Sequence, residues 1–377
     1  MAPPDAGPVR IAPATSPLMS APAIPFTEIF GRNLAASAAP VATDLARAIV
    51  LERYGIDVAD IQQLAAEKDA NFRVTAPSGA SMLLRVAHPD EDPSTFSLHS
   101  DVLLHLAQRA PELPVQRVFR DLEGATHSVW SDPAGQPRQL RLVSFLPGPP
   151  QRTMSRSASQ RRAIGEILGK LQLALADFSH PAERHRTIWD IQHAGSLRPV
   201  LAIFDDVSTR TILEHALDIF DDRVAPALPS LRRQMVHNDF NSDNILISPS
   251  NTDEVCGIID FGDAVNTAAA IDLAVACVYQ LHDDDDVLRP AFDVLSGFVS
   301  VKQLTEVEMS TLYDLFLVRL AVRVFIAFFR AKRSPENRAY ILRNTSQAIA
   351  QLHRLLTLPP GAVRERIFNT CKESRIS

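Results

Sequence analysis

Hydrophobic positions in the first 150 residues follow two different periods. At 43–54 (TDLARAIVLERY), Leu45, Ile49 and Leu51 recur at helical spacing between Thr43, suited to cap the start, and Gly55, suited to close the end, which predicts a helix. Short apolar runs bounded by turn residues predict strands at 61–65, 71–76, 81–86, 116–120 and 140–145. Another helix, with apolar residues three and four apart, is expected at 95–108. We therefore expect a small antiparallel sheet with one inserted helix.

The pattern changes after residues 146–150 (LPGPP), which can continue neither a helix nor a central strand. Helical periodicity then predominates, at 163–178, 270–281, 287–300, 304–332 and 337–356. Short apolar runs lie between these segments, at 235–236, 245–247 and 255–259. These patterns predict an α+β chain with a small, sheet-containing N-lobe at 30–147 and a larger, mainly helical C-lobe at 148–377. Residues 1–29, rich in Pro and Ala, are expected to form a disordered tail.

Composition and charge narrow the classes of function. The chain has 38 Lys and Arg against 44 Asp and Glu, a net charge of −6, and no strongly basic block, which argues against a nucleic-acid partner. The apolar run Leu315–Phe329 is interrupted by Arg319 and Arg323, which argues against a membrane span. The three cysteines are at no metal-ligand spacing, and prolines interrupt any export signal, so a cytoplasmic location is expected.

The strongest local signal is the segment 236–247 (VHNDFNSDNILI), followed by 257–263 (GIIDFGD). Asn244 lies five residues after Asp239, and Asp260 ends the next apolar run. This spacing can bring three oxygen-bearing side chains to one point. Such a set suits Mg²⁺, which usually takes one or two carboxylates while substrate phosphates and water fill its other positions. Asp239 would then be free to accept a proton from a hydroxyl group.

The pattern HxDxxxxN followed by IIDFGD resembles the catalytic and metal loops of the aminoglycoside phosphotransferase family, whose members are relatives of protein kinases. Within that family the chain is most similar to hydroxylysine kinases, over about Phe30 to Cys371. The resemblance implies a protein-kinase-like fold in two lobes, with nucleotide bound by the N-lobe and acceptor by the C-lobe.

The resemblance also implies a reaction. Asp239 would be the catalytic base, and Asn244 and Asp260 would hold Mg²⁺ on the phosphates of ATP or GTP. The γ-phosphoryl group would pass to a hydroxyl of a small amine or amino acid, with a hydroxylysine-like acceptor favoured. Homoserine, choline and aminoglycosides remain open as acceptors.

Other residues near the motif have structural interpretations. His237 is expected to hydrogen-bond to backbone and support the loop, while Asp263 and Asp272 are interpreted as scaffold or capping residues. The acidic run Asp283–Asp286 is interpreted as a solvated turn, with an alternative role as an acidic rim that attracts a cationic acceptor.

The N-lobe departs from the family pattern. Arg85 stands where the family commonly has the lysine that contacts the nucleotide phosphates, and His99 occupies the position of the acidic or amide partner of that cation, with Asp101 close by. The phosphate loop at 66–71 has no glycine. These departures leave open a degenerate pseudokinase that binds nucleotide without turnover.

Four further residues complete the predicted nucleotide site. Either the side chains of Lys68 and Asn71 assist the loop that lacks glycine, or nucleotide is held weakly. Ser144 and Leu146, in the segment that links the lobes, would hydrogen-bond to the nucleotide base through their backbone.

Overall fold

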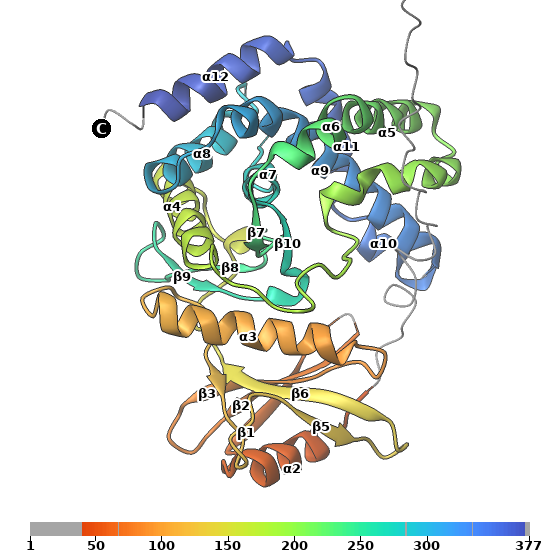
Figure 1. Ribbon diagram of the computed structural model, residues 1–377. Helices are drawn as coiled ribbons and strands as arrows, with labels where there is room; N and C mark the ends of the chain where they lie inside the picture. The colour runs from red at the N-terminus through yellow and green to blue at the C-terminus, as the bar shows by residue number, and fades with distance from the viewer. Residues whose placement is uncertain (1–39, 67, 283–284, 334, 374–377) are drawn as a thin grey trace, which may run out of the picture.

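The computed structural model describes residues 40–66, 68–282, 285–333 and 335–373, so the predicted tail at 1–29 lies outside the described residues. An antiparallel sheet with two helices is followed by a larger, mainly helical part (Figure 1). The predicted α+β class is confirmed. The predicted boundary at 147–148 falls between the last strand of this sheet, β6 (Pro137–Ser144), and the short helix η1 (Gln151–Thr153), and stays a prediction.

The sheet of the small lobe has six antiparallel strands. Its order is β1-β2-β3-β6-β4, and β5 pairs with the first half of β6. The strands other than β6 are β1 (Asp60–Leu64), β2 (Ala70–Thr75), β3 (Ser81–Val86), β4 (Val118–Phe119) and β5 (Ser128–Ser131). Strands were therefore predicted within one residue at β1, β2 and β3, whereas β5 was not predicted.

The two faces of this sheet have different partners. One face is apolar: Phe72, Leu84 and Leu142 are fully buried in the core formed with helix α2 (Thr43–Tyr54). Because side chains alternate along a strand, the neighbouring positions point to the opposite face. There, Asn71 lies opposite Arg85, and Arg85 opposite Arg141, in one line across β2, β3 and β6.

Helix α3 (Pro93–Arg109) lies between this sheet and the large lobe (Figure 1). Leu98, Val102 and Leu106 on α3 belong to the hydrophobic core of the large lobe. The sheet face that carries Asn71, Arg85 and Arg141 is therefore turned toward the interface between the lobes.

Gly148 lies in the connection between the lobes. Its φ of +123° is in the region that favours glycine. A Cβ at this position would lie 2.7 Å from Cys256 Sγ and 2.9 Å from the carbonyl oxygen of Ile247. The chain thus crosses from one lobe to the other in close contact with the large lobe.

The large lobe is built around α9 (Glu306–Arg333), which packs against helices from several parts of the chain. The other helices are α4 (Ala158–Ala174), η2 (Ile191–Ile203), α5 (Val207–Ile219), η3 (Phe220–Val224), α6 (Ala225–Ala227), η4 (Leu228–Ser230), η5 (Phe261–Asp263), α7 (Ala269–Val278), α8 (Arg289–Val301), η6 (Pro335–Asn337), α10 (Arg338–Ile341), α11 (Thr345–Leu356) and α12 (Pro360–Glu373). Helices α4 and α8 approach closely through glycine: a Cβ on Gly165 would lie 2.0 Å from the carbonyl oxygen of Val294.

Two antiparallel strand pairs hold the loops of the sequence motif. β7 (Arg233–Val236) pairs with β10 (Val265–Ala268), and β8 (Ile245–Ile247) pairs with β9 (Val255–Ile258). The predicted apolar runs thus form β7, β8 and β9. β10 was not predicted.

The helix predictions differ from the structure at three places. The predicted helix at 337–356 is two helices, α10 and α11, because residues 342–344 form a turn. The helices at 191–219 and at 360–373 were not predicted. In η2, Pro199 interrupts helical hydrogen bonding, and the segment is a 3₁₀ rather than an α-helix, so it lacks the 3.6-residue period.

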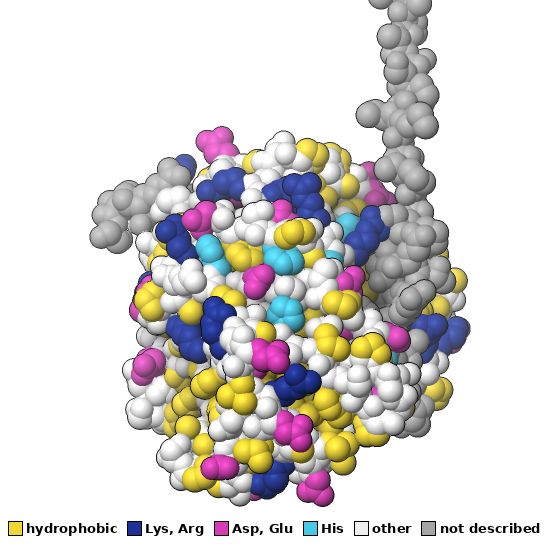
Figure 2. Space-filling view, turned by 60° about the horizontal axis from the view of Figure 1, so that its bottom comes forward, with side chains coloured by type: hydrophobic (Ala, Val, Ile, Leu, Met, Phe, Trp, Pro, Cys, Tyr) yellow, Lys and Arg dark blue, Asp and Glu magenta, His cyan; other side chains and the backbone are white. Residues whose placement is uncertain are grey.

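Charges of both signs are interspersed over the face of the molecule seen in Figure 2. Among the helices of the described residues, none combines the length and hydrophobicity required to cross a membrane.

Candidate active site

The loop after β7 has a strained backbone that directs Asp239 outward from the strand. Asn238 has a φ of +64°, which a non-glycine residue rarely adopts. Its N–H donates to Oδ1 of the fully buried Asp272 at 2.9 Å. His237 accepts at Nδ1 from the N–H of Asp239, and its Nε2 lies 3.0 Å from the carbonyl oxygen of Ile259. His237 and Asp272 thus support the loop, in the structural roles expected for them.

The Asp239 carboxylate is held by three side chains. Its Oδ1 accepts from Arg319 Nη2 at 3.1 Å, and its Oδ2 accepts from Asn241 Nδ2 at 2.7 Å and from Asn244 Nδ2 at 3.0 Å. Burial raises the pKa of Asp239, while the positive charge of Arg319 opposes this rise. The carboxylate therefore has a fixed orientation and a strengthened affinity for a proton.

Asp260 joins this group from the loop after β9. Its φ is +61°, and its Oδ1 accepts from the N–H of Gly262 at 3.2 Å. The preceding residue, Ile259, donates its N–H to the carbonyl oxygen of Asn244 at 3.0 Å, so the two loops are tied together. The negative charge of Asp260 also contributes to the raised pKa of Asp239. The structure thus brings Asn244 into hydrogen-bond contact with Asp239 and places Asp260 close enough for its charge to act on Asp239.

The donor set of this cluster fits Mg²⁺. Asn244 uses its amide nitrogen to bond to Asp239, which leaves its carbonyl oxygen as a ligand, and Asp260 supplies a carboxylate. Over the described ranges, no group of three or more His, Cys, Asp or Glu side chains could hold a metal ion. An amide and a carboxylate, completed by phosphate oxygens and water, are what a nucleotide-bound Mg²⁺ requires.

Asp263 lies near this cluster. Thr187 Oγ1 donates to Asp263 Oδ1 at 2.6 Å. Burial, together with the negative charge of Asp239, raises the pKa of Asp263 to about 7. The bond to Thr187 fits the scaffold role that the sequence indicated.

On the small lobe, Arg85 is held by two acidic residues, one directly before β2 and one in the segment before α3. Its Nε donates to Asp69 Oδ2 at 2.6 Å, and its Nη2 lies 3.7 Å from Glu91 Oε1. Lys68 also pairs with Glu91, at 2.9 Å. Asp69 and Glu91 are therefore the partners of Arg85, and sequence reasoning missed both.

The position aligned as the acidic partner of Arg85 does not serve that role. His99 is fully buried on α3, and neither of its ring nitrogens bonds to any residue of the described part of the chain. Burial lowers its pKa well below the usual value, so it cannot act as a cation. Asp101 Oδ2 lies 3.5 Å from His180 Nε2 rather than pairing with Arg85.

Arg141 is a second buried cation beside Arg85. The two residues lie directly opposite on β3 and β6, and their guanidinium carbons lie 4.8 Å (Arg141) and 5.3 Å (Arg85) from the centre of the Phe96 ring. Burial, followed by the charge of Arg85, lowers the pKa of Arg141 to about 9. Within the described ranges no carboxylate forms an ion pair with it. The sequence could have indicated Arg141 as a candidate site residue, because it is a charged residue within the predicted strand at 140–145.

Asn71 extends the same line across the sheet. It lies opposite Arg85, and its Oδ1 is buried without a hydrogen-bond partner in the described part of the chain. The predicted nucleotide-binding residues Lys68, Asn71 and Arg85 are thus gathered at one end of the sheet.

Ser144 and Leu146 differ in the availability of their backbone groups. The N–H of Ser144 donates to the carbonyl oxygen of Arg117, and its carbonyl oxygen accepts from Gln116 Nε2. Leu146 forms no backbone hydrogen bond with any of the residues described. Of the two residues predicted to bind the base, only Leu146 has backbone groups left for a ligand.

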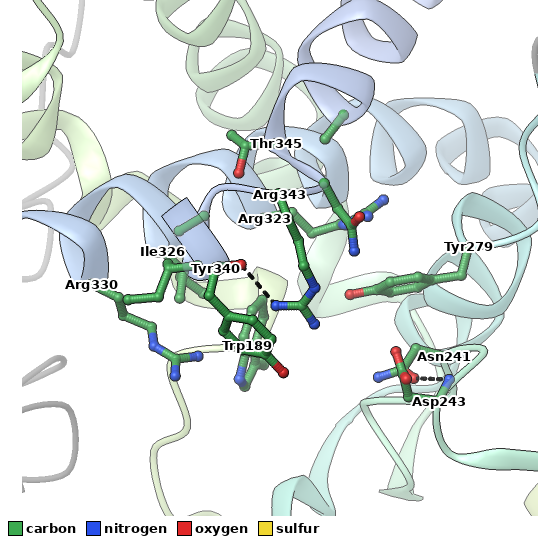
Figure 3. Close-up of a pocket in the computed structure, with 14 residues that line it drawn as sticks. Trp189, Asn241, Asp243, Tyr279, Arg323, Ile326, Arg330, Tyr340, Arg343 and Thr345 are labelled. Atoms are coloured by element: carbon green, nitrogen blue, oxygen red, sulfur yellow. Dashed lines mark hydrogen bonds between the residues drawn. The ribbon is translucent and has the colours of Figure 1, made fainter. Parts of the chain in front are cut away.

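A cavity of about 220 Å³ adjoins the catalytic loop (Figure 3). Asn241, which bonds to Asp239, and Trp189 line it. Arg319 stacks between the rings of Trp189 and Tyr279, at 5.0 and 5.7 Å from their centres, and bonds to Asp239. The cavity is therefore next to the candidate base. The sequence showed Arg319 only as an interruption of an apolar run, and its role was missed.

The acidic run at 283–286 is only partly visible. Asp283 and Asp284 lie outside the described residues. Asp286 forms an ion pair with Arg366 at 2.6 Å, which lowers its pKa, so this carboxylate is engaged within the protein.

Comparison with known proteins identifies the family. The family model described as "Phosphotransferase enzyme family" (APH) matches residues 60–300, so the chain belongs to this family. The chain is 28% identical to the hydroxylysine kinase of Mus musculus over 367 residues, which covers 91% of this chain and 97% of that protein. The resemblance found in the sequence is confirmed.

Two solved structures share the fold. A microcompartment-associated aminopropanol kinase has a TM-score of 0.67 at 20% identity, over 84% of this chain and 98% of that chain. The amicoumacin kinase hAmiN, in complex with AMP-PNP, Ca²⁺ and Ami, has a TM-score of 0.61 at 16% identity, over 81% of this chain and 94% of that chain. The chain is thus a small-molecule kinase, a phosphotransferase with an alcohol group as acceptor.

Proposed function

We propose that this kinase transfers the γ-phosphoryl group of ATP or GTP to a hydroxyl of an amino acid or amino alcohol, with a hydroxylysine-like acceptor favoured. The observation that carries the proposal is the cluster of Asp239, Asn244 and Asp260 between two tied loops, next to a cavity in the large lobe. We further expect a cytoplasmic enzyme without a nucleic-acid partner, and its three cysteines are free thiols.

Asp239 would act as the base. Its raised pKa strengthens its attraction for the proton of an acceptor hydroxyl, and Arg319, Asn241 and Asn244 fix the direction of the carboxylate. Orientation of this kind supplies much of the rate acceleration in phosphoryl transfer, because the transition state is loose. Mg²⁺, held by Asn244 and Asp260, would neutralise charge on the donor phosphates.

The donor site would lie between the cluster and the sheet face of the small lobe. Asp69 and Glu91 raise the pKa of Arg85, burial lowers that of Arg141, and the negative charge of Asp260 acts on both, so both cations lie near the proposed metal site. Their guanidinium groups would bind phosphate oxygens, and the backbone of Leu146 would bind the base. The AMP-PNP in the amicoumacin kinase supports ATP as donor. GTP remains the alternative.

The acceptor is inferred from the relatives. The name of the mouse relative, which matches along nearly its whole length, favours hydroxylysine. Homoserine, choline and aminoglycosides are the alternatives.

A degenerate kinase, which binds nucleotide without transferring phosphate, is the alternative from another class of function. Arg85 in place of lysine and the absence of glycine at 66–71 favour it. Asp69 and Glu91 nevertheless hold Arg85 in an organised site, and the base and both proposed metal ligands are present. We therefore favour an active enzyme.

An acceptor screen tests the proposal. The protein would be incubated with Mg²⁺ and either ATP or GTP, with hydroxylysine, homoserine, choline, ethanolamine or an aminoglycoside, and phosphorylated product followed by ³¹P NMR. We expect a phosphate monoester of hydroxylysine and the highest kcat/KM for that acceptor. Nucleotide binding without transfer to any acceptor would support the degenerate kinase and contradict the proposal.

A further inference from the structure

The cavity beside the catalytic loop is lined by basic side chains. Arg323, Arg330 and Arg343 line it, whereas Asp243 is the one carboxylate among the described lining residues and forms an ion pair with Arg152 (Figure 3). All the lining residues belong to the large lobe, between positions 189 and 348. The cavity is thus electropositive and separate from the sheet face expected to receive the nucleotide.

Arg323 has no anionic partner in the part of the chain that the structure describes. It lies four residues after Arg319 on α9, so the two side chains project from the same side of the helix. Its guanidinium carbon lies 4.3 Å from the centre of the Tyr279 ring, and it forms no hydrogen bond or ion pair with any residue of the described ranges. A half-buried guanidinium placed on an aromatic face, with its five donors unused, is suited to bind an anion.

Arg343 provides a second guanidinium at the same cavity. It lies 3.8 Å from the centre of the Tyr340 ring, and its Nη1 donates to the carbonyl oxygen of Tyr340 at 2.8 Å. These contacts hold it at the mouth of the cavity, where it is exposed. Two cations are therefore available, one on α9 and one in the turn after α10.

The size and position of the cavity define the ligand further. Its volume of about 220 Å³ is below the roughly 300 to 1,000 Å³ of sites for drug-sized ligands. Asn241 lines it and bonds directly to Asp239, and Trp189 links it to Arg319. A small molecule in this cavity can carry an anionic group at Arg323 and a hydroxyl directed at the candidate base.

We propose that this cavity binds the carboxylate of an amino-acid acceptor, with Arg323 as its principal partner and Arg343 beside it. The proposal rests on the proposed function and deepens it: the acceptors are hydroxy amino acids, and amino alcohols without a carboxyl group are poor substrates.

The test compares three acceptors that differ only at the carboxyl group: hydroxylysine, its primary amide, and the corresponding diamino alcohol without that group. For the unmodified protein we expect kcat/KM to fall roughly 10- to 100-fold for the last two, the range for hydrogen bonds to charged groups. R323Q should lower kcat/KM for hydroxylysine by a similar factor and leave the other two unchanged. R333Q is the control, because Arg333 is an exposed residue of α9 outside the cavity.

Several outcomes would overturn the inference. If the unmodified protein has equal kcat/KM for the three acceptors, this result alone rejects the carboxylate site. An equal loss for all three in R323Q would show a structural rather than a binding role. If hydroxylysine is not phosphorylated at all, the proposed function fails, and calorimetric binding of hydroxylysine against its amide still tests the cavity: equal affinities would reject the carboxylate site.

Discussion

Arg319 Nη2 donates to Oδ1 of Asp239 at 3.1 Å, and the Arg319 side chain is fully buried in α9. The other guanidinium nitrogen, Nη1, donates to the carbonyl oxygen of Trp189 at 2.9 Å. One side chain thus joins the candidate base to Trp189 in the wall of the cavity. A buried cation in this position both orients the carboxylate and limits the rise of its pKa.

Replacement of Arg319 should change the pH dependence of the reaction. The charge of Arg319 lowers the pKa of Asp239, so R319M should raise that pKa further. A base is active when deprotonated, so the acidic limb of kcat/KM should move to higher pH, by about one unit or more. R319K keeps the charge and should show a smaller shift. An unchanged acidic limb in R319M would contradict the coupling.

The backbone at Asn238 gives a prediction about stability. Asn238 is fully buried with a φ of +64°, and neither amide atom of its side chain bonds to a described residue. N238G and N238A remove the same side chain, but only alanine is strained in this conformation. We expect N238A to be less stable than N238G by about 1 kcal/mol in urea unfolding. Equal stabilities would show that the loop relaxes without cost.

Asn244 gives a prediction about metal dependence. N244A removes one of the two proposed Mg²⁺ ligands and should raise the Mg²⁺ concentration required for half-maximal activity, while high Mg²⁺ partly restores kcat. N251A, in the exposed turn between β8 and β9, is the matched control. The assignment of Asn244 fails if N244A titrates with Mg²⁺ like N251A.

Lys302 gives a prediction about stability and pH, away from the active site. Its Nζ donates to Gln172 Oε1 at 3.0 Å and to Gln234 Oε1 at 2.6 Å, and burial lowers its pKa to about 8. Between about pH 8 and 10.5, Lys302 is protonated in the unfolded chain and neutral in the folded chain. The contribution of Lys302 to the free energy of unfolding therefore rises with pH over this range.

The comparison of the protein with K302M isolates this contribution. From pH 8 to pH 10.5, the free energy of unfolding of the unmodified protein should rise relative to that of K302M by up to about 3 kcal/mol. A difference that is constant with pH would show that Lys302 has an ordinary pKa in the folded protein.

The sequence predicted the strands and the motif loops that short-range patterns determine. Alternating apolar residues located β2 and β3, and the spacing of Asp239, Asn244 and Asp260 identified loops that hydrogen bonds now tie together. These features depend on local period or on fixed spacing, and both are visible in one sequence.

Long-range pairings were beyond local patterns. Arg319 is 80 residues from Asp239 in the chain, and Glu91 pairs with Arg85 from a loop before α3. A buried charge in an apolar helix signals a partner without identifying it. His99, at the position aligned with the family's acidic or amide partner, is buried and bonds to no described residue, and Asp69 and Glu91 pair with Arg85 instead.

The most direct test of the account is single-turnover phosphoryl transfer by D239N, with nucleotide affinity measured in parallel. Loss of the base should lower the transfer rate by about 10²- to 10⁴-fold and leave the dissociation constant of the Mg²⁺-nucleotide complex unchanged, whereas the exposed control D222N should match the unmodified protein. A D239N enzyme that transfers phosphate at the unmodified rate would contradict the account.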